Sequence, residues 1–465
     1  MRNTFSIKPL IAGVAAATLG VLSALSSLCA DAHPTIRIGG QVTQKGEQLP
    51  SNAYCVANYG FQCLGPSDIR TAYGLNPLLN AGYNGAGETI VLIESYGSPT
   101  LAADLQQFDA DFAIPDPPSL IVLAPLGTAT VDMTQPDQQG WAFETSLDVE
   151  WAHAIAPGAA IIVLTSPVDE TEGVQGLPEF LALEEYALDH HLGHIISQSW
   201  AATENTLFPK AAGLRGPLVI AGFSAFYERA RLERITIFAS TGDDGSENAA
   251  TYDSTLGVPT SFYTFPTVNF PASSPLVTAV GGTTLNLNAA SQYQSETVWN
   301  DNSIGAGAGG GGVSQVFPIP DYQLGLPFRA RSILGGHRGI PDVSYNADDA
   351  NSAIFVYTSF LGAVYGPGAV GYYLIGGTSE GSPQWAGIVA DLNQYGHAPL
   401  GFLNPRLYAL GTSGLFPVFG HDVTQGNNSY GGVAGYNATV GWDPATGWGT
   451  PKFDLLPQKW GQFNQ

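Results

Sequence analysis

The chain has 465 residues, enough for one large domain or two to three smaller ones, and 44% of them are apolar, which is ample for a large buried core. Asp and Glu outnumber Lys and Arg by 39 to 16, and the formal net charge of -23 argues against nucleic acid and anionic membrane surfaces as partners. Because the chain has few ammonium groups, it gains little positive charge when its carboxylates are protonated, which is compatible with work in acid.

The first 32 residues have the pattern of an export signal. Arg2 and Lys8 give a positive start, residues 10–25 form an apolar run, and Ala30-Asp31-Ala32 offers a cleavage site. A transmembrane anchor is the alternative, which the serines at the end of the run and the cleavage site disfavour. No later segment is long and apolar enough to span a bilayer. We therefore expect residues 1–32 to be a signal peptide and the protein to be secreted and extracellular.

Cysteine usage agrees with export. Of three cysteines, Cys29 lies in the signal, which leaves Cys55 and Cys63 in the exported chain. Two such cysteines indicate a disulfide that closes a small loop, worth about 2–3 kcal/mol through loop entropy. Zinc is disfavoured because the chain offers only two sulfurs there and no histidine nearby. We expect residues 33–65 to be an N-terminal extension that contains this disulfide, and the bridge to hold the entry of the chain to the main domain.

Beyond residue 65 the chain alternates between strand and helix patterns. Apolar, β-rich runs occur at residues 88–95, 159–166, 194–200 and 235–241, and helical spacing occurs at residues 101–112 and in the run that starts at Leu177. This alternation predicts a mainly parallel sheet with helices on both faces, in one large α/β domain, since no linker or internal repeat divides the chain. The low-complexity run GAGAGGGG at residues 305–312 predicts a flexible or closely packed loop.

Residues 140–159, GWAFETSLDVEWAHAIAPGA, have a strong helical pattern that contains two acids. Glu144 and Asp148 are four apart, so they lie on one face, close enough to share a hydrogen bond. Such a pair usually marks a solvated acidic face. Here the helix is otherwise rich in Trp, Ala, Val, Ile and Phe, and two like carboxylates on a buried helix are costly unless one is protonated. That cost makes the pair a functional candidate.

Polar residues follow three of the predicted strands. Glu94 stands at the end of one strand run, Asp243 and Asp244 follow another, and Ser379 follows the apolar strand in YYLIGGTSEGSPQWAGIVADL at residues 372–392. Ser379 is bracketed by glycines in the pattern G-x-S-x-G. Because the carboxyl ends of parallel strands meet at one edge of a sheet, we expect these side chains to lie close together. A serine alone is a weak nucleophile, so a proton acceptor is needed.

Histidine is one candidate acceptor. An α/β-hydrolase would need an acid and then a histidine downstream of Ser379. The candidates are Asp391, Asp422 or Asp443 with His397 or His421. Little chain follows the serine, and neither histidine has a distinctive context, which disfavours this alternative. The carboxylate pair of Glu144 and Asp148 is the other candidate.

Seven motifs, taken in chain order, together resemble the sedolisins, the family of serine-carboxyl peptidases. They are FETSLDVEWAHAIAPGA, ASTGDDGS, FPASSPLVTAVGGTTL, GGGGVSQVFPIPDYQ, RGIPDVSYNAD, GGTSEGSPQWAG and GWDPATGWGTP. The resemblance covers the chain from about Cys63 to its end. It implies a subtilisin-like α/β fold and an acid-acting peptidase domain at residues 66–465. Such a protein is an endopeptidase or a tripeptidyl-peptidase acting on protein or peptide substrates, and we expect a monomer.

The resemblance also implies catalytic roles. Ser379 matches the family nucleophile, Glu144 its general base, and Asp148 the acid that orients and tunes that base. The base accepts a proton from the serine only when it is ionised, and the pair titrates as a unit.

Three further positions match the family pattern. Asp243 matches the acid that lines the oxyanion hole, with Asp244 as the rival if the turn is offset. Glu94 and Trp200 match positions that extend the hydrogen-bonded network behind the glutamate. Asp243 must be protonated to donate a hydrogen bond, so the resemblance implies an optimum near the ordinary carboxyl range of about 4.

A structural calcium ion is a further implication. The family pattern assigns one Ca²⁺ to the Asp422 and Asp443 side chains and to the carbonyls of Val423, Thr439 and Gly441. Such an all-oxygen ligand set suits Ca²⁺. Without the resemblance, both aspartates would be interpreted as turn-forming residues, Asp443 especially because it precedes a proline. Thr439 stands where the family has glycine, and we expect that β-branched residue to strain the loop.

A second departure concerns the N-terminus. Many sedolisins carry a long N-terminal prodomain, whereas residues 33–65 alone separate the predicted signal from the catalytic region. We expect this member either to fold without a prodomain or to be restrained in another way. A secreted, non-catalytic binding protein on a peptidase scaffold is the alternative. The joint presence of the serine and its three acids disfavours it.

Overall fold

The computed structural model describes residues 36–169, 173–208, 215–253 and 258–453. The predicted signal peptide at residues 1–32 lies outside the described residues. Within the described part of the chain, no helix combines the length and the apolar composition needed to cross a bilayer.

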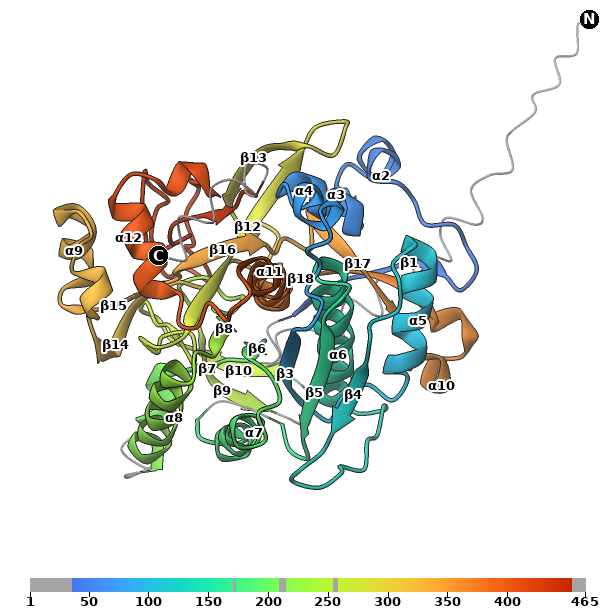
Figure 1. The fold of residues 1–465 in the computed structure, drawn as a ribbon, viewed down its shortest axis with the longest axis horizontal. Coiled ribbons are helices and arrows are strands. Elements are labelled where there is room, and N and C mark those ends of the chain that lie inside the picture. The colour runs from blue at the N-terminus through green and yellow to red at the C-terminus, as the bar shows by residue number, and fades with distance from the viewer. Residues whose placement is uncertain (1–35, 170–172, 209–214, 254–257, 454–465) are drawn as a thin grey trace, which may run out of the picture.

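A sheet of eight strands forms the centre of the molecule (Figure 1). Its strand order is β13 (Tyr293–Val298), β12 (Thr278–Leu287), β8 (Thr236–Ser240), β6 (Ile195–Gln198), β3 (Thr89–Ser95), β5 (Ala160–Ser166) and β4 (Leu120–Leu123), with β16 (Val343–Asn346) paired to β12. Every pairing is parallel except that of β12 with β13. The predicted, mainly parallel sheet is confirmed, and β3, β5, β6 and β8 are each slightly shorter than their predicted runs.

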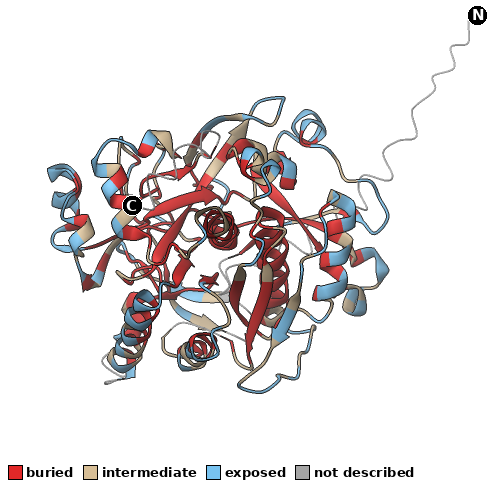
Figure 2. Cartoon of the chain, viewed as in Figure 1, coloured by how far each residue is buried: buried red, intermediate tan, exposed pale blue. Residues whose placement is uncertain are grey.

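Helices cover both faces of this sheet. On one face these are chiefly α6 (Pro136–Ile155) and α11 (Gly381–Gly396), and on the other α7 (Leu177–Asp189) and α8 (Arg215–Leu232). Further helices of the described residues are α3 (Pro66–Ala72), α4 (Asn76–Asn80), α5 (Leu101–Phe112), α9 (Phe328–Leu334), α10 (Gly362–Tyr365) and α12 (Asn404–Thr412). In β3, Ile90 and Leu92 belong to the apolar cluster that contains α6 and α11, whereas Val91 and Ile93 belong to the cluster of α7 and α8. Successive strand residues point to opposite faces, so both faces are buried, as Figure 2 shows.

Helix α6 is buried along most of its length. It begins at Pro136, a residue that fits the first helical position because its missing N–H would have no partner there. From Gln139 to Ile155 every residue is buried, so the helix is enclosed all round rather than amphipathic. Glu144 and Asp148 are both 0% exposed. The solvated acidic face is thereby excluded.

A smaller sheet has the order β1 (Arg37–Gln44), β18 (Gly371–Gly376), β17 (Ser352–Thr358) and β2 (Gln62–Leu64). Strand β18 is antiparallel to both of its neighbours. Cys55 in α2 (Asn52–Asn58) and Cys63 in β2 form a disulfide with their Cα atoms 6.0 Å apart. The N-terminal extension is therefore part of this sheet through β1 and β2.

The C-terminal half of the glycine run at residues 305–312 is closely packed. The Gly310 N–H donates to the carbonyl of Gly242 at 2.7 Å, and the Ala308 N–H donates to the carbonyl of Asp243 at 2.9 Å. A Cβ atom on Gly310 would lie 2.2 Å from the carbonyl oxygen of Thr241. Only glycine lets the two backbones approach so closely, and the run thereby supports the turn that follows β8.

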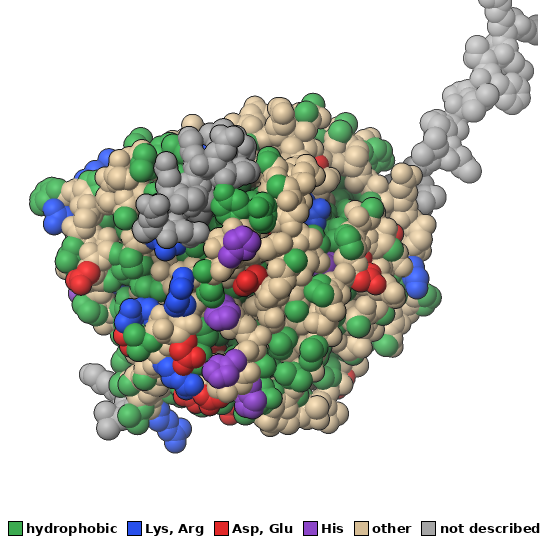
Figure 3. Space-filling model, in the orientation of Figure 1, with side chains coloured by type: hydrophobic (Ala, Val, Ile, Leu, Met, Phe, Trp, Pro, Cys, Tyr) green, Lys and Arg blue, Asp and Glu red, His purple; other side chains and the backbone are tan. Residues whose placement is uncertain are grey.

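Charged side chains are sparse on the face shown in Figure 3. Near α8 the basic groups are mixed with acids: Arg229 pairs with Asp189, and Arg231 pairs with Glu228. The described residues form no continuous basic patch on this face.

Three fully buried acids make stability depend on pH. Glu150, Glu184 and Glu380 are 0% exposed, and loss of water raises the pKa of each well above its ordinary value. Each is neutral in the folded protein in acid. Such groups contribute stability that is fully present below the unfolded pKa of about 4.3 and is lost as pH rises through the higher native pKa.

We expect the free energy of unfolding in urea to be greater at about pH 4 than at about pH 8. Glu150→Gln removes one buried ionisation and should reduce the difference. Asp116→Asn, at an exposed acid, is the matched control and should leave the difference unchanged. A free energy of unfolding that increases from acid to alkali would contradict this explanation.

Candidate active site

Several chain segments meet at the carboxyl edge of the central sheet. Strand β3 delivers Glu94, the residue after β6 is Ser199, and β8 leads through a glycine to Asp243. Strand β18 leads to Ser379, and the acids of α6 lie alongside (Figure 1). Strands β3, β6 and β8 are parallel, so the residues that follow them meet at this edge as expected. Strand β18 belongs instead to the smaller sheet and is antiparallel to its neighbours, so the expectation that Ser379 follows a strand of the parallel sheet is wrong.

Ser379 lies in a 3-10 turn, Thr378–Glu380, between β18 and α11, and is fully buried. Gly377 has a φ of 111°, which favours glycine. A Cβ atom on Gly376 would lie 2.5 Å from the carbonyl oxygen of Ala347. The two glycines therefore allow the sharp change from strand to helix that puts the serine at the start of α11.

Glu144 faces Ser379 from α6. Burial raises the pKa of Glu144 well above its ordinary value, the Asp148 charge raises it further, and an interaction with the Ser379 hydroxyl lowers it. No described residue gives either oxygen of Glu144 a hydrogen bond of ordinary length. A loose contact of this kind is common between a nucleophile and its base before substrate binds.

Asp148 lies one helical turn further along α6. The Ser199 hydroxyl reaches its two oxygens at 3.0 and 2.8 Å. Burial raises the pKa of Asp148 to about 7, opposed by the hydrogen bonds from Ser199 and by the nearby carboxyls of Glu94 and Glu144, which lower it. Burial also raises the pKa of Glu94 well above its ordinary value, followed by the charges of Asp148 and Glu144. The three buried carboxyls therefore share protons and titrate together.

The predicted hydrogen-bonded role of Trp200 is not seen. Its ring packs against Phe180 and Phe223, with ring centroids 4.7 and 6.1 Å away. Among the described residues its indole N–H has no hydrogen-bond partner. The neighbouring Ser199 binds Asp148 instead. The sequence SQSW gave no sign of this, because a serine at a strand end has no distinctive pattern.

Asp243 is fixed next to the serine. Its Oδ1 accepts hydrogen bonds from the backbone N–H and the hydroxyl of Thr378, at 2.8 and 2.9 Å. Its Oδ2 is buried and receives no hydrogen bond from the described residues. Burial raises the pKa of Asp243 to about 6, opposed by the positive charge of Arg37 and by the Thr378 bonds. Because Oδ1 already accepts two bonds, a proton on this carboxyl belongs on Oδ2, where it can be donated.

Asp244 has a different environment. Its side chain is 16% exposed and forms an ion pair with Arg37 at 2.8 Å. Asp243, rather than Asp244, binds the residue directly before Ser379.

The two candidate histidines lie elsewhere. His397 directly follows α11, whereas Ser379 precedes its first residue, so a 16-residue helix of about 24 Å separates them. His421 stacks on Tyr293, with ring centroids 3.5 Å apart. The Ser-Asp-His arrangement is not supported by these positions.

The predicted calcium ligands lie around one loop. The Gly441 N–H donates to Asp422 Oδ2 at 2.9 Å, and the Thr439 N–H donates to Asp443 Oδ2 at 2.6 Å. Backbone amides of the following turn donate to Asp443 Oδ1, as expected of a turn former. Asp422 Oδ1 is buried without a partner among the described residues, and Val423 is buried beside it. Thr439 does not have a left-handed φ, so the expected strain is not seen.

No family model matches the chain. Kumamolisin from Bacillus sp. (strain MN-32) is 36% identical over 389 residues, which cover 83% of this chain and 61% of that protein. Sedolisin from Pseudomonas sp. (strain 101) is 30% identical over 424 residues, 90% of this chain and 63% of that protein. Human tripeptidyl-peptidase 1 is 30% identical over 323 residues, 67% of this chain and 51% of that protein. The chain thus spans less than two thirds of the length of these relatives.

A solved structure has a similar fold. Pseudomonas sedolisin, a serine-carboxyl proteinase complexed with two molecules of pseudo-iodotyrostatin, superposes with a TM-score of 0.67 at 27% identity. The match covers 87% of this chain and 100% of that one. The predicted subtilisin-like α/β fold is confirmed by this match.

We expect Ser199→Ala to raise the pKa of Asp148, because the ionised carboxylate loses the hydroxyl that binds both of its oxygens. Titration of the aspartate carboxyl ¹³C resonances would measure the shift. Ser146→Ala is the matched control, since this buried serine of α6 donates to the carbonyl of Ala142 instead. An Asp148 titration that is the same in both variants would exclude the proposed role of Ser199.

Proposed function

The chain belongs to the sedolisin family, and from this we propose that it is a secreted, acid-acting serine-carboxyl peptidase that hydrolyses protein or peptide substrates. One observation carries the proposal: Glu144 faces Ser379 in a buried site whose other acid, Asp243, is fixed beside the serine. Cleavage is internal or releases tripeptides, and the enzyme acts as a monomer. Secretion rests on the signal pattern of residues 1–32.

In the first half of the reaction, Ser379 Oγ attacks the peptide carbonyl carbon and its proton passes to Glu144. Asp148 orients Glu144 and shares protons with it, as the coupled, buried pair allows. The carbonyl oxygen becomes an oxyanion and accepts the hydrogen bond of protonated Asp243. Glu144 then gives its proton to the leaving nitrogen, the C–N bond breaks, and an acyl-enzyme remains on Ser379.

In the second half, water attacks the acyl carbon while Glu144 takes one of its protons. Collapse of the second tetrahedral intermediate breaks the ester bond and returns that proton to Ser379. A carboxyl can replace histidine as base because burial raises the pKa of Glu144.

The pH dependence follows from two opposite requirements. The cluster of Glu94, Glu144 and Asp148 must hold a negative charge, whereas Asp243 must hold a proton. Burial raises the pKa of Asp243 to about 6, so activity declines as pH rises through this value. Burial of these carboxyls therefore moves both the acid and the alkaline pH limit of activity upward from the ordinary carboxyl range of about 4.

We also propose one structural calcium ion, held by the side chains of Asp422 and Asp443 and by the carbonyls of Val423, Thr439 and Gly441. The buried, unpartnered Oδ1 of Asp422 and the all-oxygen donor set support the fit. When bound, the ion would supply charge that holds the two acids and the 439–441 loop together.

We expect proteolysis to peak on the acid side of neutrality and to depend unequally on Ser379 and on three acids. Ser379→Ala and Glu144→Gln should lose nearly all activity, because each removes a member of the proton-transfer unit. Asp148→Asn should be intermediate. Asp243→Ala should be slower by about two to three orders of magnitude, as expected for one oxyanion donor.

Steady-state rates on a peptide library, with products identified by mass spectrometry, would measure these effects. Asp244→Ala is the matched control for Asp243→Ala and should stay close to wild type at the acid optimum, where Asp243 is protonated in both. Full activity of Asp243→Ala with an inactive Asp244→Ala would show that the oxyanion role belongs to Asp244. No proteolysis at any pH would favour the non-catalytic binding protein.

We expect the melting temperature to rise with free Ca²⁺, because a ligand of the folded state alone stabilises it. Burial raises the pKa of Asp443 to about 7, so the melting curves should be recorded above that pH, where both acids are ionised. Asp443→Ala should abolish the response, and Glu228→Ala, at an exposed acid, should preserve it. Melting curves that are indifferent to Ca²⁺ and to chelator would exclude the site.

A further inference from the structure

A strand of the N-terminal extension brings a positive charge to the carboxyl site. Arg37 is the first residue of β1 and pairs in register with Gly376 of β18, three residues before Ser379. It is only 7% exposed. A buried arginine needs acidic partners, and here they come from the turn after β8.

The guanidinium of Arg37 contacts both acids of that turn. Its Nη2 donates to Asp244 Oδ1 at 2.8 Å and to the backbone carbonyl of Asp243 at 3.1 Å. Its Nε lies 3.9 Å from Asp243 Oδ2, the oxygen that would carry the donated proton. A Cβ atom on Gly307 would lie 2.6 Å from the Trp299 ring and 3.2 Å from this Nε, so glycine at that position leaves room for both side chains.

The charged groups around Asp243 come from several elements. The positive charge of Arg37 in β1 lowers the pKa of Asp243, and the negative charge of Asp244 raises it. The charge of Asp243 in turn raises the pKa of Glu144 in α6 and of Asp349, which follows β16. Tyr430 faces the arginine itself. Within this group of described residues Arg37 is the one with a positive charge, and it opposes the effect of burial on Asp243.

We propose that Arg37 is a positioning residue for Asp243, held between the two acids of the β8 turn, and that it fixes the upper pH limit of the peptidase. This inference rests on the proposed function. The positive charge favours ionised Asp243, so it lowers the pH at which the oxyanion donor is lost. Without the arginine, burial and the neighbouring carboxylates would keep Asp243 protonated to a higher pH.

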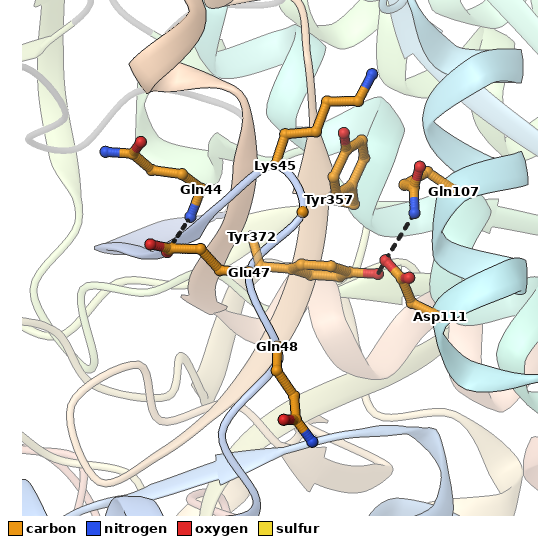
Figure 4. Close-up of a pocket in the computed structure, with 9 residues that line it drawn as sticks. Gln44, Lys45, Glu47, Gln48, Gln107, Asp111, Tyr357 and Tyr372 are labelled. Carbon is orange, nitrogen blue, oxygen red and sulfur yellow. Dashed lines mark hydrogen bonds between the residues drawn. The ribbon is translucent and has the colours of Figure 1, made fainter.

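Strand β1 is also fixed at its other end, so Arg37 is held by a strand anchored on both sides. Beyond Gln44 the chain turns around a polar hollow of about 200 Å³, shown in Figure 4. Glu47 accepts the Gln44 N–H at 2.8 Å, and the Lys45 N–H donates to the carbonyl of Val370 at 2.8 Å. On the facing side, the Tyr372 hydroxyl donates to Asp111 at 2.9 Å.

The test compares the pH profiles of kcat/KM for wild type, Arg37→Gln and Asp244→Asn. Arg37→Gln should move the alkaline limb upward by about one pH unit and leave the acid limb in place. Asp244→Asn removes a negative charge that raises the pKa of Asp243, so it should move the alkaline limb downward. Arg37→Lys should restore most of the wild-type profile. Lys45→Gln, at the far end of β1, is the matched control.

Melting curves in acid show whether β1 stays attached in Arg37→Gln. If β1 does not stay attached, the alkaline limb of the Asp244→Asn profile tests the proposal, because that change leaves the strand intact. An unmoved alkaline limb, or movement of the alkaline limb in the same direction in both variants, overturns the proposal.

If wild type cleaves no peptide at any pH, the proposed function fails, and ¹³C titration of Asp243 with and without Arg37→Gln then decides the arginine's role. A rise in the Asp243 pKa supports it, and an unchanged pKa overturns it.

Discussion

The site depends on carboxyl groups that are buried without enough positive charge to balance them. A carboxylate withdrawn from water is costly, and the cost falls if the group is protonated or hydrogen-bonded. Glu94, Glu144 and Asp148 are all 0% exposed and act on one another, so the cluster retains protons that isolated acids would lose. In the proposed mechanism, proton transfer from Ser379 to Glu144 depends on that retention. Burial likewise favours the neutral form of Asp243 in acid, which the proposed oxyanion role requires.

Much of the fold was predictable because it depends on local patterns. Residues 101–112 form α5 as predicted, and the alternation of strands and helices gave the parallel sheet. The four-residue spacing of Glu144 and Asp148 put both acids on one helix, and the glycines around Ser379 indicated a strand-to-helix turn. Each of these features is determined by residues a few positions apart. The roles given to them came from the family resemblance, and local pattern alone left histidine open as the proton acceptor.

The remaining contacts could not be predicted because they join residues that are distant in sequence. Ser199 and Asp148 are 51 residues apart, and Arg37 and Asp243 are 206 apart. Trp200 matched a family position, yet its ring lies in the apolar cluster of α7 and α8. The glycine run at residues 305–312 indicated either flexibility or close packing, and only the approach of Gly310 to the backbone after β8 decides between them. Burial of these groups is a property of the assembled core.

The central claim is that carboxyl groups, and no histidine, assist the reaction of Ser379. A peptide aldehyde tests it directly, because the aldehyde forms a hemiacetal with an activated serine and places an oxygen in the oxyanion hole. The dissociation constant should be measured by calorimetry across pH, with Ser379→Ala as the blank. The account predicts the tightest binding in acid and progressive weakening as pH rises through the Asp243 pKa of about 6. Binding that strengthens toward neutrality, as a histidine base would require, would contradict it.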